Sequence, residues 1–371
     1  MSAGIYAHVP FCLTRCGYCD FNAYEGLDDA APRYVRSLRA EADLSAPGWV
    51  GEEVVSVFLG GGTPTTLDPA DLKAVLVRLR DRFEVVPDAE VTIEANPDTV
   101  DASKLAALLD AGFNRLSMGA QSFDPRVLAS LERIHGPDSV RRAMAAAREA
   151  RHANVSLDLI YGAPGETLRS WERTLREAIG LAPEHVSAYA LTVEPSTPLG
   201  RQIAGGDRPA PDPDLQADMF GIACELLAGA GYGHYEVSNW AKPGFECRHN
   251  LGYWMRRPCL GLGAGAHSYR DERRWWNVRP PEDYMAGVEG GRLPVGGEDR
   301  LAPSDAHLEE MFLRLRILEG IPSSWIDDDR AVPFLESGLL DERNGSLVPT
   351  ERGMLLLNEL VLALAEGVPR S

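Results

Sequence analysis

The sequence predicts an α/β fold: an incomplete parallel (β/α)6 barrel followed by a smaller, α-rich C-terminal domain with a winged-helix-like arrangement. Two observations predict the barrel. Apolar stretches of strand length alternate with longer stretches of helical periodicity, and the strand candidates end in polar or glycine-rich clusters. A third observation, a turn signal between short apolar runs near the C-terminus, predicts the separate smaller domain.

The alternation starts at an apolar run over 5–9. The run over 54–59 is apolar enough for a strand that is buried on both faces. Further strand candidates are 90–95, 115–119, 154–160 and 186–193, and the helix candidates are 31–44, 68–82, 101–111, 138–152, 168–179 and 214–230. Such alternation predicts right-handed units on a parallel sheet, with functional residues at the carboxyl ends of the strands. We expect a barrel core over 1–230, an extension over 231–299 and a C-terminal domain over 300–371.

The composition is that of a folded globular protein, with 371 residues, 44% hydrophobic and 25% charged. A net charge of −18 argues against a general nucleic-acid binder, which needs a basic surface. The chain has no apolar run long enough to span a membrane and no basic segment before an apolar one at its start, so we expect a cytoplasmic protein. The cysteines at 224, 247 and 259 are then expected to be thiols rather than disulfides.

Three cysteines lie directly after the first predicted strand. Three residues separate Cys12 from Cys16, and two separate Cys16 from Cys19. Three thiolates at this spacing can hold a cubane iron-sulfur cluster and leave one iron without a protein ligand, where chemistry can occur. A zinc site completed by His8 or Asp20 is the alternative, although zinc motifs usually present two separated pairs of ligands. A disulfide is disfavoured because the number of clustered cysteines is odd.

Polar groups follow the predicted strands at one edge of the sheet. The second strand ends in Gly60-Gly61-Gly62-Thr63, where missing side chains allow backbone amides to approach a small ligand. Later strands carry Glu94, Gln121 and Asp158, which need partners if they are buried. A shared polar ligand would satisfy all three, and Arg133 can meet the carboxylate of such a ligand. A tight turn and internal hydrogen bonds are the alternative interpretation.

A family resemblance becomes specific here. The spacing CxxxCx(aromatic)C, with Tyr18 as its aromatic residue, is that of the radical S-adenosylmethionine (SAM) superfamily. The stretches YAHVPFCLTRCGYCDF, FLGGGTPT, IEANPD, GAQSFD, LERIHG and DLIYGAPGE resemble the core of its oxygen-independent coproporphyrinogen III oxidase branch. The resemblance implies a radical SAM barrel with a 4Fe-4S cluster on the three cysteines. It also implies SAM contacts from Tyr6, Tyr18, Gly61, Gly62, Thr63, Glu94, Gln121, Arg133 and Asp158, with a structural role as the alternative for Tyr6 and Asp158.

Two departures from the oxidase pattern weigh against oxidase activity. Phe21 stands where the oxidase has a further cysteine, and eleven residues precede Cys12 where the oxidase has a long extension. Downstream, HNLGYW at 249–254 is similar to the HNxxYW element of the HemW heme chaperones, which belong to the same branch. That resemblance implies heme as a ligand, with His249 bound to its iron and two aromatic residues against the macrocycle. A hydrogen-bonded core histidine is the alternative.

Arginines are concentrated in the same region. Residues 244–280 contain seven arginines against three acidic residues. Arg256-Arg257 follow the HNLGYW element, and Arg273-Arg274 precede Trp275-Trp276. Arginine beside aromatic residues suits a flat ligand that bears carboxylates. RNA binding, or a solvated face over buried tryptophans, would explain the same composition.

The last part of the chain predicts a helix over 308–318, a turn at 320–322, a short element over 331–340 and a final helix over 350–365. Asn344-Gly345 between short apolar runs predicts a hairpin. DNA binding is not expected, because residues 301–371 hold six arginines and no lysine against thirteen acidic residues. We expect this domain to cover the mouth of the barrel or to dock an acceptor protein.

Taken together, these observations and resemblances predict a heme chaperone that binds a 4Fe-4S cluster and SAM and delivers heme to respiratory hemoproteins. Its partners would be heme and a hemoprotein acceptor, which can be a membrane protein, and no nucleic acid. The alternative is an oxygen-independent coproporphyrinogen III oxidase, which decarboxylates its substrate by means of a 5'-deoxyadenosyl radical. A third possibility, an iron-sulfur protein without SAM, is disfavoured by the number of polar residues at the strand ends.

Overall fold

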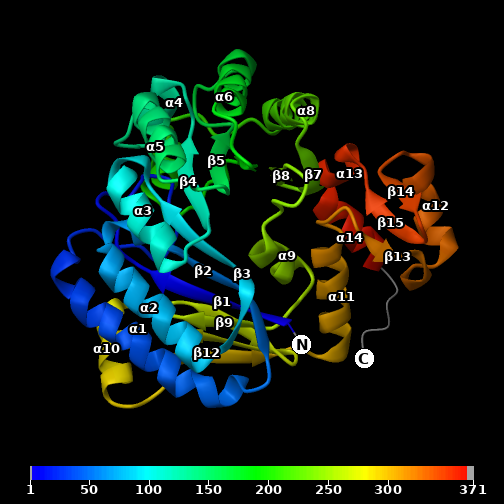
Figure 1. Ribbon diagram of the computed structural model, residues 1–371. Coiled ribbons are helices and arrows are strands. Elements are labelled where there is room, and N and C mark those ends of the chain that lie inside the picture. Colours follow the sequence, from blue (N-terminus) through cyan, green and yellow to red (C-terminus); the bar gives the residue numbers. More distant parts are fainter. Residues whose placement is uncertain (1, 366–371) are drawn as a thin grey trace.

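The computed structural model describes residues 2–365 and is built on one large sheet with helices along its outer face (Figure 1). The first six strands lie side by side in chain order and are all parallel. They are β1 (Ser2–Val9), β2 (Glu53–Gly61), β3 (Glu84–Ala95), β4 (Arg115–Gln121), β5 (Val155–Tyr161) and β6 (His185–Ala190). β1 pairs on its other side with β9, and β6 pairs with β8. The barrel is therefore open, and the predicted α/β class with an incomplete parallel barrel is confirmed.

Eight helices accompany these strands in the described chain. They are α1 (Ala31–Ser45), α2 (Pro69–Arg82), α3 (Ala102–Ala111), α4 (Pro125–Ser130), α5 (Pro137–Glu149), α6 (Leu168–Gly180), α7 (Pro198–Ala204) and α8 (Pro213–Gly229). Six of them match the predicted helices. The sequence did not predict α4 and α7, because helices of six and seven residues are too short to display a periodic apolar face.

The helix starts follow from local side-chain chemistry. Asp68 accepts a hydrogen bond from the backbone N–H of Ala70 at the start of α2, and Asp101 accepts one from the backbone N–H of Lys104 at the start of α3. Thr167 and Ser170 form a reciprocal capping box at the start of α6. These caps satisfy backbone donors that have no partner inside the helix, so each helix starts at a defined residue.

The two faces of the strands differ in chemistry. On β3, Val91 and Ile93 belong to the apolar core, which includes the inner sides of the helices. The intervening Thr92 and Glu94 point to the opposite face, which is the inside of the barrel. The same alternation on the neighbouring strands leaves the interior lined by polar side chains. The parallel strands are thus buried on both faces, but only the outer face is apolar.

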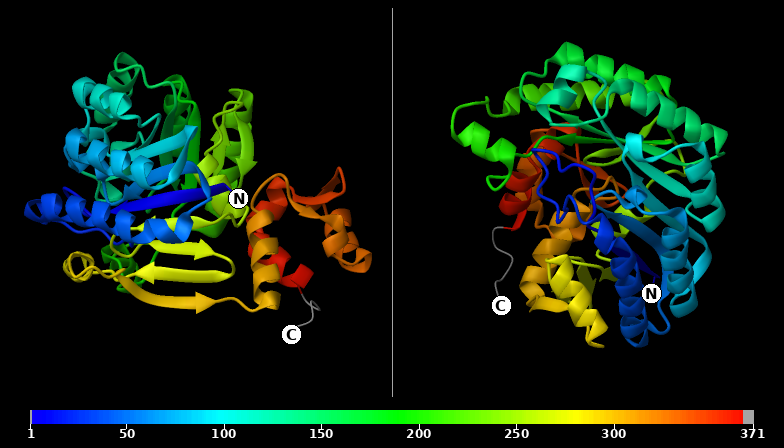
Figure 2. Two further views of the ribbon diagram at one scale, coloured as in Figure 1. Left: turned by 60° about the horizontal axis from the view of Figure 1, so that its bottom comes forward. Right: turned by 90° about the vertical axis from the view of Figure 1, so that its left-hand side faces the viewer.

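The segment after α8 extends the same sheet at both edges. β7 (Gly233–Glu236) and β8 (Asn239–Ala241) form an antiparallel hairpin beside β6. β9 (Cys259–Leu262) runs parallel to β1, with Gly4 opposite Cys259. The antiparallel strands β10 (His267–Arg270), β11 (Arg273–Asn277) and β12 (Val295–Arg300) continue the sheet beyond β9, as Figure 2 shows, and α10 (Pro281–Glu289) packs against α1.

Helix α9 (Arg248–Trp254) leaves the sheet and packs inside the barrel, against β1 and β2 (Figure 1). Glu90 on β3 holds the start of this helix. The Glu90 carboxylate accepts hydrogen bonds from the N–H groups of Arg248 at 3.0 Å and His249 at 3.1 Å. A buried carboxylate at a helix N-terminus interacts favourably with the exposed backbone N–H groups there. α9 therefore closes the end of the barrel at which the parallel strands begin.

The C-terminal segment forms a lobe with its own core, beside α9 and β7 (Figure 1). It contains α11 (Pro303–Arg314), β13 (Ile321–Pro322), α12 (Asp328–Glu336), β14 (Leu340–Arg343), β15 (Ser346–Pro349), α13 (Glu351–Leu355) and α14 (Leu357–Ala365). Its three strands form an antiparallel sheet in the order β13-β15-β14. Asn344 and Gly345 connect β14 to β15 with positive φ angles of 52° and 77°, which confirms the predicted hairpin. The predicted final helix is broken at Leu356, which leaves helical geometry with φ −114°.

Candidate functional site

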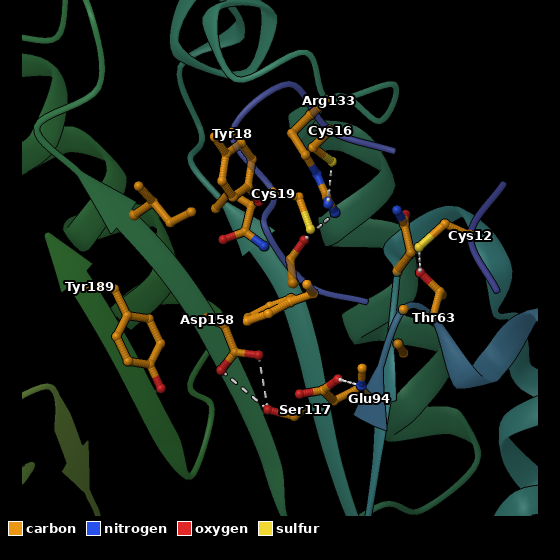
Figure 3. Close-up of a pocket in the computed structure, with 18 of the residues that line it drawn as sticks. Cys12, Cys16, Tyr18, Cys19, Thr63, Glu94, Ser117, Arg133, Asp158 and Tyr189 are labelled. Atoms are coloured by element: carbon orange, nitrogen blue, oxygen red, sulfur yellow. Dashed lines mark hydrogen bonds between the residues drawn. The ribbon is translucent and has the colours of Figure 1, made fainter. Parts of the chain in front are cut away.

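A cavity of about 480 Å³ opens at the carboxyl ends of the parallel strands (Figure 3). This is the edge of the sheet at which the polar residues were expected, and the volume is in the range of small-molecule sites. The cavity brings together eleven of the predicted site residues: Cys12, Cys16, Cys19, Tyr18, Gly61, Gly62, Thr63, Glu94, Gln121, Arg133 and Asp158. Two predicted residues, Tyr6 and His249, do not line it.

The cysteine loop is fixed to the ends of β1 and β2 through its backbone. The N–H of Gly62 donates to the carbonyl of Val9 at 2.8 Å, and that of Thr63 donates to Phe11 at 2.7 Å. A Cβ atom on Gly62 would lie 2.6 Å from the Phe11 carbonyl oxygen, so only glycine fits. Asn22 ties the far end of the loop to the extension, because its amide nitrogen donates to the carbonyls of Ala264 at 3.0 Å and Arg279 at 2.9 Å.

Glu94 lies at the cavity wall beside the glycine turn. The N–H of Gly61 donates to its carboxylate at 2.9 Å, and Gly61 has a φ of 114°, which favours glycine. Burial and the nearby Asp158 carboxylate raise the pKa of Glu94 to about 7. This carboxyl group can therefore accept a hydrogen bond from a ligand ammonium or hydroxyl group, or carry a proton, near neutral pH.

Asp158 is held by three serines from three neighbouring strands. Its carboxylate accepts hydrogen bonds from Ser117 at 2.9 Å (Figure 3), Ser187 at 2.8 Å and Ser156 at 3.1 Å. Burial raises its pKa, and these hydroxyls together with Arg115 oppose that shift. Asp158 therefore has the defined orientation of a residue that positions ligand hydroxyl groups.

Arg133 connects the cysteine loop to β4. Its guanidinium donates to the Cys16 sulfur at 3.2 Å and to the carbonyl of Gly119 at 3.0 Å. Gln121, at the end of β4, has a φ of 61°. This backbone conformation is unfavourable for any residue other than glycine, and it recurs at functional sites. A cation beside a thiolate ligand suits an iron-sulfur site, whose thiolates are anionic.

Tyr6 and His249 lie together beneath the cavity. Their ring centroids are 6.4 Å apart, and both rings pack near Phe58, whose own ring does line the cavity. His249 Nδ1 is 3.0 Å from the Ser56 hydroxyl, and Nε2 is 3.2 Å from the Tyr253 hydroxyl. Burial and Arg115 lower the pKa of His249 to about 3, so the ring is neutral. The sequence prediction of a heme ligand thus falls on a histidine whose two ring nitrogens both have protein partners.

The cysteine loop fits a cluster better than a single metal ion. Within residues 2–365 the six cysteines form no disulfide, and no three His, Cys, Asp or Glu side chains converge as ligands of one ion. His8, one of the two residues that could complete the alternative zinc site, has both ring nitrogens occupied, by the Tyr6 hydroxyl at 3.0 Å and the Asn22 carbonyl at 2.9 Å. A cubane binds each thiolate at a different iron and so accepts thiols that are farther apart.

Several cavity residues were not predicted. Arg115 and Ser117 line the cavity from β4, Ser187 and Tyr189 line it from β6, and Asn250 reaches it from α9. Every second residue of β4 faces the cavity: Arg115, Ser117, Gly119 and Gln121. Because side chains alternate along a strand, counting backwards in steps of two from Gln121 would have predicted Ser117 and Arg115 as well. No comparable signal exists for Asn250, because its position depends on how α9 folds into the barrel.

Comparison with known proteins agrees with this geometry. The model of the radical SAM superfamily matches residues 6–178. The "Heme chaperone HemW" of Mycobacterium tuberculosis is 44% identical over 97% of this chain and 94% of its own length. The chain belongs to the HemW family of radical SAM proteins. The Escherichia coli HemW is 37% identical, over 98% of each chain. The cofactors that the radical SAM family implies are a 4Fe-4S cluster and SAM.

Among solved structures, the coproporphyrinogen III oxidase of Escherichia coli, described as a radical SAM enzyme, aligns over 98% of this HemW-family chain and 90% of its own. The TM-score is 0.83 and the sequence identity 24%. At this identity the likeness establishes the fold, including the C-terminal lobe, and leaves the activity open. Within residues 2–365, no helix has the length and apolar character needed to cross a lipid bilayer.

Proposed function

We propose that this protein is a heme chaperone that binds a 4Fe-4S cluster and SAM in the barrel cavity and delivers heme to respiratory hemoproteins. The observation that carries the proposal is the 44% identity, over 97% of the chain, to a relative named as a heme chaperone. The cavity supports the cofactor part of the proposal, because it gathers three thiols, a glycine turn and two oriented carboxylates at one mouth.

In this proposal Cys12, Cys16 and Cys19 hold the cluster, and the Arg133 guanidinium stabilises the thiolate of Cys16. Bound together, a cluster and SAM supply one-electron chemistry. The Glu94 carboxyl accepts hydrogen bonds from the amino or hydroxyl groups of SAM, and Asp158 orients hydroxyl groups through its three serine partners. Gly61 and Gly62 line the cavity together with Glu94, so their backbone can face the ligand.

The deciding experiment is an anaerobic assay of the cluster-reconstituted protein with SAM, a low-potential reductant and coproporphyrinogen III. We expect no protoporphyrinogen IX by chromatography, and we expect heme to move from the loaded protein to a heme-free respiratory hemoprotein. Phe21, which is 64% exposed, stands where the oxidase pattern has a cysteine, and this supports the expectation. Multiple turnover to protoporphyrinogen IX would establish the oxidase instead.

The proposed role of His249 in heme binding requires a rearrangement. Iron can reach Nε2 only if the Tyr253 hydroxyl moves away, so Tyr253→Phe should leave heme affinity equal or higher, whereas His249→Ala should weaken it. The Soret band reports both effects. An unchanged Soret band and affinity in His249→Ala would leave His249 as a structural residue of the barrel floor.

A further inference from the structure

Arg115 occupies an unusual position at the floor of the barrel cavity. It is the first residue of β4, opposite Thr92 of β3, and both residues are on the interior face. The Arg115 side chain is 2% exposed to solvent, yet it lines the cavity together with Asn250, Ser187 and Tyr189. It thus lies deeper than Arg133, which reaches the cysteine loop at the mouth.

This guanidinium lacks a direct partner. Its Nε has no hydrogen-bond partner, and no carboxylate of residues 2–365 lies within ion-pair distance of it. The Thr92 hydroxyl on the neighbouring strand is also buried without a partner. Buried cations are normally paired and hydrogen-bonded, because removal from water costs free energy that only such contacts offset. Because Arg115 lines the cavity, its guanidinium without a direct partner indicates a missing ligand.

The carboxylates around Arg115 are bonded to other groups. Glu90 accepts from the backbone of α9 and from the Cys247 thiol at 3.4 Å. Asp158 accepts from its three serines, and Glu94 accepts from Gly61. Glu90 and Asp158 compensate the charge of Arg115 from a distance without occupying its donors. The guanidinium remains free to bind an anion that enters through the cavity.

The surroundings match one end of an amphiphilic ligand. Asn250 offers an amide, Ser187 and Tyr189 offer hydroxyls, and Phe58 and Ile160 provide apolar wall on the way to the mouth. A carboxylate is the anion that a planar guanidinium binds most favourably, through two parallel hydrogen bonds. The cavity therefore offers a carboxylate subsite at its floor and apolar surface above it.

We propose that Arg115 binds a carboxylate of the ligand held in the barrel and that, for a heme cargo, this carboxylate is a propionate. The proposal rests on the proposed heme-chaperone function and places one propionate of its cargo at the floor of the barrel, away from the cysteine loop that is assigned to the cluster. Arg115 is then a specificity-determining residue that distinguishes tetrapyrroles with free propionates from neutral ones.

The test compares heme with its dimethyl ester, in which both propionates are neutral, by titration of the reconstituted protein followed at the Soret band. The wild type should bind heme about tenfold or more tightly than the ester, because a charge-assisted pair is lost with the ester. Arg115→Gln should bind both with nearly equal affinity, and Arg115→Lys should keep part of the preference for heme. Far-UV circular dichroism and thermal melting show whether each variant is folded.

Arg270→Gln is the matched control. Arg270 lines a separate cavity of about 390 Å³ with Trp49 and Trp275, and it is ion-paired with Glu52 at 3.3 Å. This variant should keep the wild-type preference for heme. Equal binding of heme and ester by the wild type, or loss of the preference in Arg270→Gln but not in Arg115→Gln, would overturn the proposal. If the wild type binds neither ligand, the proposed function itself fails, which is a separate outcome.

Discussion

The contact between Gly62 and the cysteine loop gives the sharpest quantitative prediction. In Gly62→Ala, the new Cβ would lie 2.6 Å from the Phe11 carbonyl oxygen and 3.0 Å from the Phe11 nitrogen and carbonyl carbon. Ordinary contacts begin at about 3.4 Å, so the two backbones would have to separate by about 0.8 Å. Both partners are backbone atoms in hydrogen-bonded segments, so no side chain can rotate away to relieve the overlap.

Overpacking of this kind typically costs about 1–3 kcal/mol. The displacement would fall on the residue before Cys12, so we also expect less iron per chain after cluster reconstitution and weaker SAM binding. Calorimetry should show a melting temperature that is lower by a few degrees. Iron analysis should show the loss of cluster, and equilibrium dialysis should show the loss of SAM affinity. Gly221→Ala is the control, because Gly221 lies within α8 with nothing within 4 Å of its Cβ position. If Gly62→Ala matches the wild type in melting and iron content, the close contact is wrong.

Three further predictions concern acidity, cluster ligands and the C-terminal hairpin. Folding raises the pKa of Glu94 from 4.5 to about 7, so the folded state binds the proton more tightly and the free energy of unfolding falls as the pH rises from about 4.5 to 7. In urea unfolding of the cofactor-free protein, the free energy of unfolding should fall less over this pH range in Glu94→Gln than in the wild type. An identical fall would show that Glu94 is not the titrating group. Cys16→Ser should abolish cluster assembly, measured by iron content and visible absorbance. The control Cys224→Ser changes a buried thiol in α8 and should assemble the cluster normally. Equal iron contents in the two variants would remove Cys16 from the ligand set. Gly345→Ala should cost about 1 kcal/mol in chemical denaturation, because its φ of 77° is strained for alanine; a loss near zero would contradict the hairpin geometry.

Much of the site could be predicted because its chemistry lies in short linear motifs. The three cysteines and the glycine turn are each local in sequence, and the parallel-sheet rule then places Glu94 and Asp158 at the same edge. The barrel was predictable for the same reason, since each strand and helix shows its own periodicity.

What could not be predicted depends on contacts between distant segments. His249 looked available as a ligand, but Ser56 and Tyr253 occupy its ring nitrogens once α9 folds into the barrel. Tyr6 faces the same buried cluster rather than the cavity. Arg115 is the first residue of a strand, and no motif around it indicates a function. Its proposed role follows from a guanidinium that is buried without a partner, which becomes visible only in the folded structure.

The pairing of β1 with β9 has a consequence for biosynthesis. Gly4 lies opposite Cys259, and Asn22 bonds to the carbonyls of Ala264 and Arg279, so the first strand and the cysteine loop gain their final neighbours only when most of the chain exists. Contacts this far apart in sequence form late, after the local helices and hairpins. On a ribosome, the three thiols would therefore emerge early and wait in an unfinished loop. The protein should acquire its cluster after release, and until then those thiols depend on a reducing environment.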